Sequence, residues 1–301
     1  MANETRRFKT DTILVTDHFN NNLRQLEIAS PMSGNASRFL FQHQVLGKYD
    51  ADYYHDEKIG YILVRQPHWL DEAYAEAISS MDTGVLARNL ANIEIMKRCL
   101  SENSHHGVHK GIDLGAGYGI FVRGMRDNGI DFHWSDKYAA NLLARGFGGQ
   151  PGERYGIATA FEVLEHLANP IEFLQDARRE FRFHTCFFSA LCFDEQKLPG
   201  TDWWYWSFES GQHISFFSQR ALLWMAEQLD MRLWHIQGEI FAFSELEWRP
   251  LKDKFRLRVW GRVCNKVERM LQPNKNSNES LTWSDLIKVR DKLRDDFKGC
   301  S

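Results

Sequence analysis

The sequence has few cysteines, no long apolar run and no marked excess of charge of one sign. Its five cysteines are scattered and form no C-x-x-C pair, which argues against a disulfide framework and a cysteine-ligated zinc site. No apolar run approaches the roughly eighteen residues that span a bilayer, and residues 1–10 contain no apolar signal segment. We therefore expect a cytoplasmic protein with reduced thiols.

The charge balance limits the class of partner. The chain has 37 basic and 40 acidic residues, a formal net charge of −3, so no global positive field attracts nucleic acid, and DNA is not an expected partner. No internal repeat or low-complexity tract is visible. With 301 residues, 43% of them hydrophobic, the chain can bury a full α/β core and still carry one or two additional modules.

A glycine-rich turn follows a short apolar strand at residues 111–119. Gly115, Gly117 and Gly119 lack a Cβ, so the backbone can bend sharply and approach a ligand beside the free N–H groups of a following helix. The third glycine comes one residue earlier than in the dinucleotide fingerprint, which favours S-adenosylmethionine (SAM) over NAD. The alternative is a glycine-rich turn that binds no ligand.

A second strand, residues 130–136, ends in an acid. Asp136 lies nineteen residues beyond Gly117, about where a ribose-binding carboxylate falls in nucleotide-binding βαβ units. We therefore predict Asp136 as a ribose ligand. The complete predicted cofactor site is Asp113, Gly115, Ala116, Gly117, Gly119, Asp136, Lys137 and Phe161.

A third apolar strand, within residues 155–170, delivers ionisable side chains at its carboxyl end. Glu162, Glu165 and His166 are spaced i, i+3, i+4, which places them on one face of a helical turn. With the distant His213 they could bind a divalent cation such as Mg²⁺ or Mn²⁺. We predict His213, Glu162 and His166 as catalytic residues.

A reading without metal is also open. In it Glu162 contacts SAM, Glu165 is solvated, His166 caps a helix end, and His213 is a general base with a pKa near neutrality. Both readings give His213 a central role.

Together these segments resemble a known family. The pattern D-x-G-x-G-x-G at 113–119, the acid at 136 and F-E-V-L-E-H-L-x-N-P at 161–170 are similar to motifs of class I SAM-dependent methyltransferases. The branch most resembled often sits among polysaccharide-biosynthesis enzymes. The E-x-x-E-H pattern with a distant histidine resembles the metal site of small-RNA 2′-O-methyltransferases and ubiquinone-pathway O-methyltransferases. The resemblance implies a cation that grips adjacent acceptor oxygens.

The leader departs from the family pattern. Relatives often carry a cysteine-ligated zinc ribbon there, whereas His55, Asp56 and Glu57 stand here where a cysteine would be expected. This departure argues against zinc in the leader.

The periodicity divides the chain into three parts. Residues 1–107 are predicted as an N-terminal module with a small β element at 38–66 and helices from residue 67, 108–248 as the SAM-binding catalytic domain, and 249–301 as a C-terminal helical extension.

The catalytic part is predicted as a doubly wound, Rossmann-like α/β sheet. Strands at 110–114, 131–135, 156–161 and 184–190 alternate with helices near 119–128, 138–147 and 171–182. A helix capped by Ser218 and strands near 231–237 and 239–247 should follow, with the strands forming the antiparallel edge that the resemblance implies.

Two further segments suggest contacts with ligands. Residues 200–210 contain five aromatic residues among six positions, which predicts either an acceptor lid or an insertion that plugs the core. Residues 251–271 form a basic amphipathic pattern, which could contact an anionic membrane peripherally or a phosphate-bearing acceptor, or simply pack on the domain.

The function predicted from these features is SAM-dependent O-methylation of a hydroxyl on a sugar, nucleotide-sugar or glycan. The partner is then a small-molecule or glycan acceptor. The alternatives are C-methylation of a deoxysugar, 2′-O-methylation of RNA ribose, and a catalytically silent SAM-binding scaffold subunit. The intact glycine turn, Asp136 and His213 argue against the silent protein.

Overall fold

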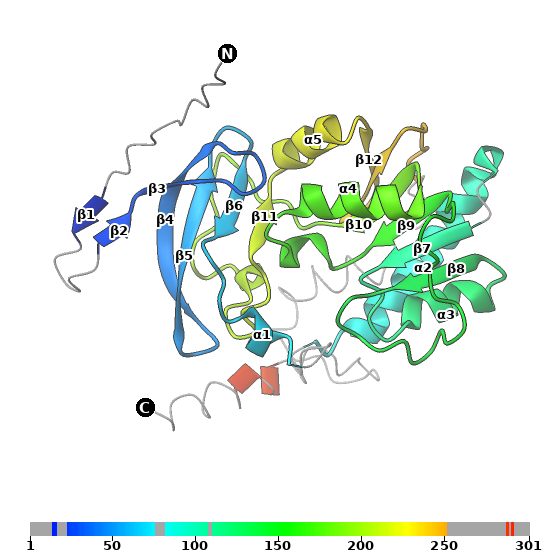
Figure 1. The fold of residues 1–301 in the computed structure, drawn as a ribbon, viewed down its shortest axis with the longest axis horizontal. Coiled ribbons are helices and arrows are strands. Elements are labelled where there is room, and N and C mark those ends of the chain that lie inside the picture. The colour runs from blue at the N-terminus through cyan, green and yellow to red at the C-terminus, as the bar shows by residue number, and fades with distance from the viewer. Residues whose placement is uncertain are drawn as a thin grey trace, which may run out of the picture.

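A six-stranded sheet forms the centre of the protein (Figure 1). The computed structural model describes residues 14–16, 23–75, 82–107, 110–251, 287–288 and 290–291. The strand order is β12-β13-β10-β9-β7-β8. The parallel strands are β7 (Lys110–Leu114), β8 (Asp131–Ser135), β9 (Ile157–Ala160) and β10 (Thr185–Ser189). The antiparallel strands are β13 (Ile240–Ser244), beside β10, and β12 (Arg232–Gln237). The α/β sheet and its antiparallel edge are confirmed.

Helices cover both faces of this sheet. They are α2 (Val85–Glu102), α3 (Ile120–Asp127), α4 (Pro170–Phe181) and α5 (Gln219–Gln228). Side chains of α4 and α5 share one buried cluster with Ala158 of β9, whereas α2 and α3 share another with the adjacent Ile157. Successive strand residues point to opposite faces, so the two clusters are the two layers of a doubly wound fold.

Local capping explains where two of these helices begin. The side chain of Asn169 accepts a hydrogen bond from the Glu172 amide at 3.3 Å, and Pro170 occupies the first turn of α4. Ser218 Oγ accepts from the Ala221 amide at 3.2 Å and caps α5, which confirms the predicted cap.

The predicted helix near 138–147 is wrong, because the chain there forms bends and a turn. The amides of Leu142 and Leu143 donate to the carbonyl of Tyr118, at 3.3 and 3.0 Å, instead of to carbonyls of their own segment. Asn141 Oδ1 accepts from the Ala144 amide at 2.9 Å and closes a local turn. The segment therefore packs on the glycine turn as a loop.

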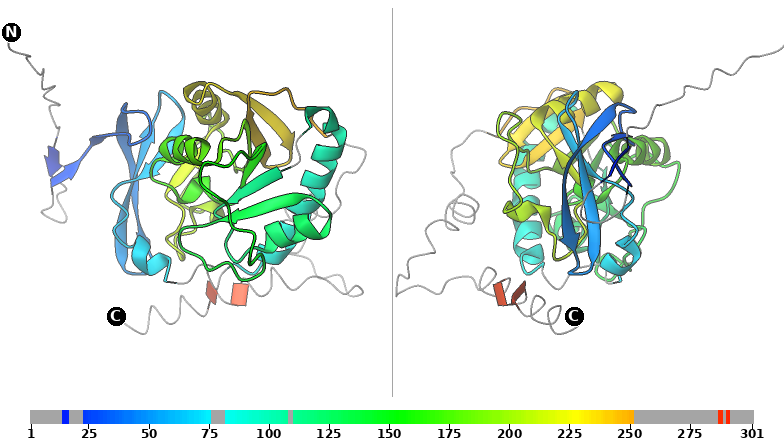
Figure 2. Two further views of the ribbon diagram at one scale, coloured as in Figure 1. Left: turned by 45° about the vertical axis from the view of Figure 1, so that its right-hand side comes forward. Right: turned by 90° about the vertical axis from the view of Figure 1, so that its left-hand side faces the viewer.

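A second, antiparallel sheet stands beside the first and has the order β11-β6-β5-β4-β3 (Figures 1 and 2). Its strands are β3 (Glu27–Ala29), β4 (Ala36–Val45), β5 (Tyr49–Asp56), β6 (Tyr61–Val64) and β11 (Ser215–Phe217). The predicted small β element is present. Its edge strand β11 comes from the predicted catalytic part and pairs with β6, so hydrogen bonds cross the boundary proposed at residue 107. The division into three parts stays a prediction.

Helices are present in the stretch predicted to be helical from residue 67, as the short α1 (Leu70–Ala73) and the longer α2. α1 forms a single turn before residues 76–81, which lie outside the described chain. Trp69 Nε1 donates to the Gly211 carbonyl at 2.8 Å, and Gln212 Nε2 donates to the Ala73 carbonyl at 2.7 Å. These two bonds fasten α1 to the segment that leads to β11.

The remaining described strands, β1 (Leu14–Thr16) and β2 (Leu23–Gln25), pair antiparallel. No helix in the described ranges is long and apolar enough to cross a bilayer. The predicted basic helix 251–271 lies outside the described residues except for Leu251, so its membrane contact stays a prediction.

Candidate active site

The glycine turn between β7 and α3 has open space beside it. Gly117 has φ +52°, in the left-handed region that favours glycine, and a Cβ added there would meet nothing within 4 Å. At Gly115, by contrast, a Cβ would lie 2.7 Å from Val163 Cγ2. Gly119 caps α3 with φ +88°. Gly117 is thus the glycine that a ligand can approach.

Asp136, at the end of β8, is bonded to this turn. Its Oδ2 accepts from the Gly117 amide at 2.8 Å, and its Oδ1 accepts from the amides of Tyr138 at 2.7 Å and Ala139 at 2.8 Å. Trp134 Nε1 donates to the Gly117 carbonyl at 2.8 Å. The structure therefore brings Asp136 and the glycine turn together, as a cofactor site requires, and the carboxylate holds the turn in shape. Its role as ribose ligand stays a prediction.

The other predicted cofactor residues differ in exposure. Asp113 is buried and accepts a hydrogen bond from Thr159 Oγ1 at 2.5 Å, and burial raises its pKa to about 7. Ala116 is also buried, Phe161 is half-buried, and Lys137 is exposed. Asp113 is therefore inside the protein and bonded to β9, whereas Phe161 is partly accessible and Lys137 is accessible.

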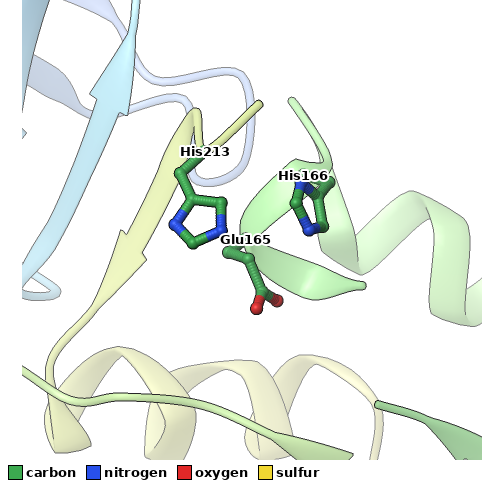
Figure 3. A group of neighbouring side chains, drawn as sticks. All are labelled: Glu165, His166 and His213. Atoms are coloured by element: carbon green, nitrogen blue, oxygen red, sulfur yellow. The ribbon is translucent and has the colours of Figure 1, made fainter. Parts of the chain in front are cut away.

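Three of the four predicted metal ligands converge. One ligand atom from each of Glu165, His166 and His213 lies within 4.8 Å of the others, and Figure 3 shows the side chains gathered in one place. Glu165 and His166 belong to a 3-10 turn, η2 (Leu164–His166), which follows β9, and His213 precedes β11. The Ile214 amide donates to the Glu165 carbonyl at 2.9 Å and joins the two segments. We call these three residues the triad.

The hydrogen bonds of the two imidazoles define their tautomers. His166 Nδ1 lies 3.1 Å from the Gln212 carbonyl oxygen, and His213 Nδ1 lies 2.7 Å from that of Tyr205. A carbonyl only accepts, so each Nδ1 carries the proton and each Nε2 keeps its lone pair. Burial, together with the neighbouring His166, lowers the pKa of His213 to about 3, and burial lowers that of His166. Both rings are therefore neutral at neutral pH, the form that binds a metal, and the lowered pKa of His213 corrects the near-neutral value expected for a general base.

Glu165 has an incomplete set of partners. Its carboxylate is buried, Oε1 accepts from the Tyr205 hydroxyl at 3.0 Å, and Oε2 has no hydrogen-bond partner within the part of the chain that the structure describes. Burial raises the pKa of Glu165, and the charge of Glu162 raises it further. An unpaired buried carboxylate oxygen is unfavourable, and a cation would satisfy it. The donor set therefore fits a divalent ion.

Glu162, the fourth predicted ligand, lies outside this group. Its Oε2 is 3.2 Å from Arg88 Nε, and its Oε1 accepts from Ser189 Oγ at 2.9 Å. Arg88 in turn donates through Nη2 to both oxygens of Asp82, at 2.7 Å. Glu162 is engaged in the ion pair with Arg88. Only three of the four predicted metal ligands therefore come together in the structure.

Of the two alternatives for the aromatic segment 200–210, the structure favours the insertion that plugs the core, because four of its five rings belong to one buried cluster or pack against it. Trp206 is fully buried. Its ring contacts those of Tyr53 in β5 and Phe41 in β4, two strands of the second sheet, at centroid distances of 5.3 and 5.1 Å. Tyr205 is buried against the triad, and among the five aromatic rings only that of Trp204 is largely exposed, at 66%. The second sheet, which includes β11, gives these rings an apolar surface to cover, and this disfavours the lid.

Sequence reasoning missed several residues around the triad. Tyr205 bonds to both Glu165 and His213 but was assigned to a lid. Tyr74 ends the leader segment 67–74, to which no role was assigned, and Arg88 lies outside every motif, so no signal in the sequence identifies their place beside the triad. Glu239 follows β12, and burial and the charge of Glu162 raise its pKa to about 7.

The fold and the glycine turn define a Rossmann-like methyltransferase. Residues 85–236 match the family model described as "Methyltransferase domain", a match that covers just over half of the chain and includes the glycine turn and the triad. The chain belongs to this family. It is a SAM-dependent methyltransferase.

Solved structures give more distant likenesses. The chain is similar to magnesium protoporphyrin IX methyltransferase from Synechocystis PCC 6803 with bound SAH, at 10% identity and a TM-score of 0.40, over 60% of this chain and 94% of that one. It is also similar to PigF with SAH, at 14% identity and a TM-score of 0.44, over 59% and 62% of the two chains. The mitomycin 7-O-methyltransferase MmcR gives 14% identity and a TM-score of 0.34, over 46% and 48%. No curated protein matches significantly.

The Asp136→Ala variant tests the cofactor site. We expect it to weaken SAM binding by about 1.5 to 3 kcal/mol, because a charge-assisted hydrogen bond to ribose is lost and the turn loses its anchor. Asp131→Ala is the matched control, since Asp131 lies at the other end of β8 and pairs with Arg126. Titration calorimetry with SAM measures both affinities. Equal affinity in Asp136→Ala and wild type would refute this role.

Proposed function

We propose that the protein transfers the methyl group of SAM to a hydroxyl of a sugar, nucleotide-sugar or glycan, with a divalent cation held by Glu165, His166 and His213. The observation that carries this proposal is the convergence of the three ligand atoms within 4.8 Å. β9, which leads to η2, pairs in parallel with β7, which leads to the glycine turn. Carboxyl ends of neighbouring parallel strands share one edge of a sheet, so cofactor and acceptor sites would be adjacent.

The chemistry asked of the protein is mainly positioning. SAM carries an activated methyl group, so the enzyme must hold the acceptor oxygen in line with it and accept the oxygen's proton. A divalent cation would lower the pKa of a bound hydroxyl and orient it. Tyr205 supports this arrangement, because its carbonyl fixes the tautomer of His213 and its hydroxyl orients Glu165.

A neutral or weakly charged acceptor suits the charges around the triad. The charge of Glu162 acts on both Glu165 and Glu239, and Arg88 is already paired with two carboxylates. Such surroundings oppose a polyanion such as RNA, whose binding rests on basic contacts to phosphates. The exposed ring of Trp204 offers a flat apolar face on which a sugar could stack. A screen for tritiated methyl transfer from SAM to neutral glycans, nucleotide-sugars and RNA tests the assignment.

Removal of divalent ions should separate the two readings of the triad. We expect EDTA treatment to reduce methyl transfer at least about a hundredfold and to leave SAM affinity unchanged, with recovery on addition of Mg²⁺ or Mn²⁺. Because the pKa of Glu165 is raised, protons compete with the cation, and Mn²⁺ affinity should increase as pH rises through neutrality. Metal analysis accompanies the rate measurements. Full activity in metal-free enzyme would leave His213 as a metal-independent base.

Silent and C-methylating alternatives give different results in the same assays. A scaffold subunit would bind SAM and transfer no methyl group to any acceptor. C-methylation would yield a product whose methyl group resists ether cleavage, which product analysis by NMR distinguishes.

A further inference from the structure

Tyr74 has a buried hydroxyl for which the described chain supplies no hydrogen-bond partner. Tyr74 directly follows α1 as its C-cap residue, in the N-terminal part of the chain. Buried tyrosine hydroxyls normally find a partner, and each exception calls for an explanation. The surroundings of Tyr74 provide one.

The ring of Tyr74 lies between the cofactor loop and the triad. It stacks on Tyr138, with centroids 5.9 Å apart and planes at 15°, and Tyr138 follows Asp136 by two residues. On another side it meets the ring of His166 edge-on, with centroids 6.1 Å apart and planes at 76°. Tyr138 is 71% exposed, so this contact borders open solvent. Tyr74 therefore borders both the loop that follows Asp136 and the triad.

The backbone around Tyr74 is fixed to the triad itself. The Ala73 carbonyl accepts from Gln212 Nε2 at 2.7 Å, and the Gln212 carbonyl accepts from His166 Nδ1 at 3.1 Å. One glutamine therefore connects the turn that carries Tyr74 with a ring of the triad. The ring of Tyr74, fixed through this backbone and its two ring contacts, is preorganised for a ligand, because its position loses little freedom on binding.

We propose that Tyr74 positions the acceptor by donating a hydrogen bond from its hydroxyl to an acceptor oxygen adjacent to the one that is methylated. The proposal rests on the proposed function. A phenol is protonated at neutral pH and can donate to a neutral hydroxyl or ether oxygen. The acceptor class is then a compound with two neighbouring oxygens, one held by the triad and one by Tyr74.

The Tyr74→Phe variant tests this role with two independent readouts. It removes a hydroxyl that has no partner in the described chain, so the melting temperature should stay the same or rise. KM for the acceptor found in the tritiated-methyl screen should increase at least about tenfold, while SAM affinity and Mn²⁺ affinity stay unchanged.

Tyr155→Phe is the matched control. Its hydroxyl accepts from the Gln150 amide at 2.8 Å and donates to Glu153 at 3.0 Å, away from the triad. This variant should lower the melting temperature and leave KM for the acceptor unchanged.

Three results would overturn the proposal in distinguishable ways. An unchanged KM for the acceptor in Tyr74→Phe would show that the hydroxyl does not bind the acceptor. If the melting temperature is also lower, the hydroxyl stabilises the folded protein instead. A weaker SAM affinity would place the contact on the cofactor. Absence of methyl transfer by the wild-type enzyme to every acceptor, with SAM bound, would remove the proposed function and this role together.

Discussion

Replacement of Gly117 by arginine is expected to abolish SAM binding while the protein remains folded. A Cβ at this position meets nothing within 4 Å, so the new side chain would extend into the open space beside the turn without a clash inside the protein. That space is where the ligand must approach the backbone. The left-handed φ of +52° adds a strain of about 1 kcal/mol, which a stable domain tolerates. Titration calorimetry with SAM measures the loss.

Gly129→Arg is the control for backbone strain and added bulk. Gly129 has φ +77° and equally open surroundings, but it lies in the turn between α3 and β8. This variant should bind SAM like the wild type and show a comparable change in melting temperature. A folded Gly117→Arg protein with unchanged SAM affinity would refute the assignment of the glycine turn to the cofactor site.

Loss of the His213 imidazole should reduce kcat at least about a hundredfold, whether the residue is a metal ligand or a general base. The His213 ring is neutral, with its Nε2 lone pair available, and it is held by the Tyr205 carbonyl. His213→Ala removes that lone pair from the triad. Single-turnover transfer of tritiated methyl groups measures the change in rate, and calorimetry should find SAM binding preserved.

His235→Ala serves as the matched control, because His235 is an exposed histidine of β12 that bonds only locally to the Gly238 carbonyl. It should keep the wild-type rate. Mn²⁺ binding separates the two roles of His213. If His213 is a ligand, Mn²⁺ should bind more weakly to His213→Ala than to the wild type; if it is only a base, the Mn²⁺ affinity should not change. A wild-type kcat in His213→Ala would exclude both.

The elements that the sequence predicted well are those set by local signals. β7, the glycine turn and α3 follow one another directly, and Ser218 caps α5 within a single turn of chain. Alternation of apolar strands and amphipathic helices was enough to identify the doubly wound sheet. The positions of Glu165 and His166 could likewise be predicted from the sequence, because both residues lie in η2, directly after a predicted strand.

The predictions failed where a segment that is distant in sequence provides the hydrogen-bond, ion-pair or packing partner. The apolar pattern at 138–147 suits a helix, but the Tyr118 carbonyl bonds two of its amides. Glu162 has the spacing of a metal ligand, yet Arg88 of α2 pairs with it. The aromatic pattern at 200–210 is compatible with a lid, but the second sheet buries Trp206. In each case the partner lies far away in sequence, and one sequence carries no record of that contact.

The pairing of β11 with β6 has a consequence for how the enzyme assembles. Ser215, only two residues beyond His213, pairs with Leu63, which lies about half the length of the chain away in sequence. Closing so long a loop is slow compared with forming a helix or hairpin. The Rossmann-like sheet could therefore form, with its glycine turn complete, before His213 reaches Glu165 and His166. Such an intermediate would have the means to bind cofactor before it could catalyse transfer.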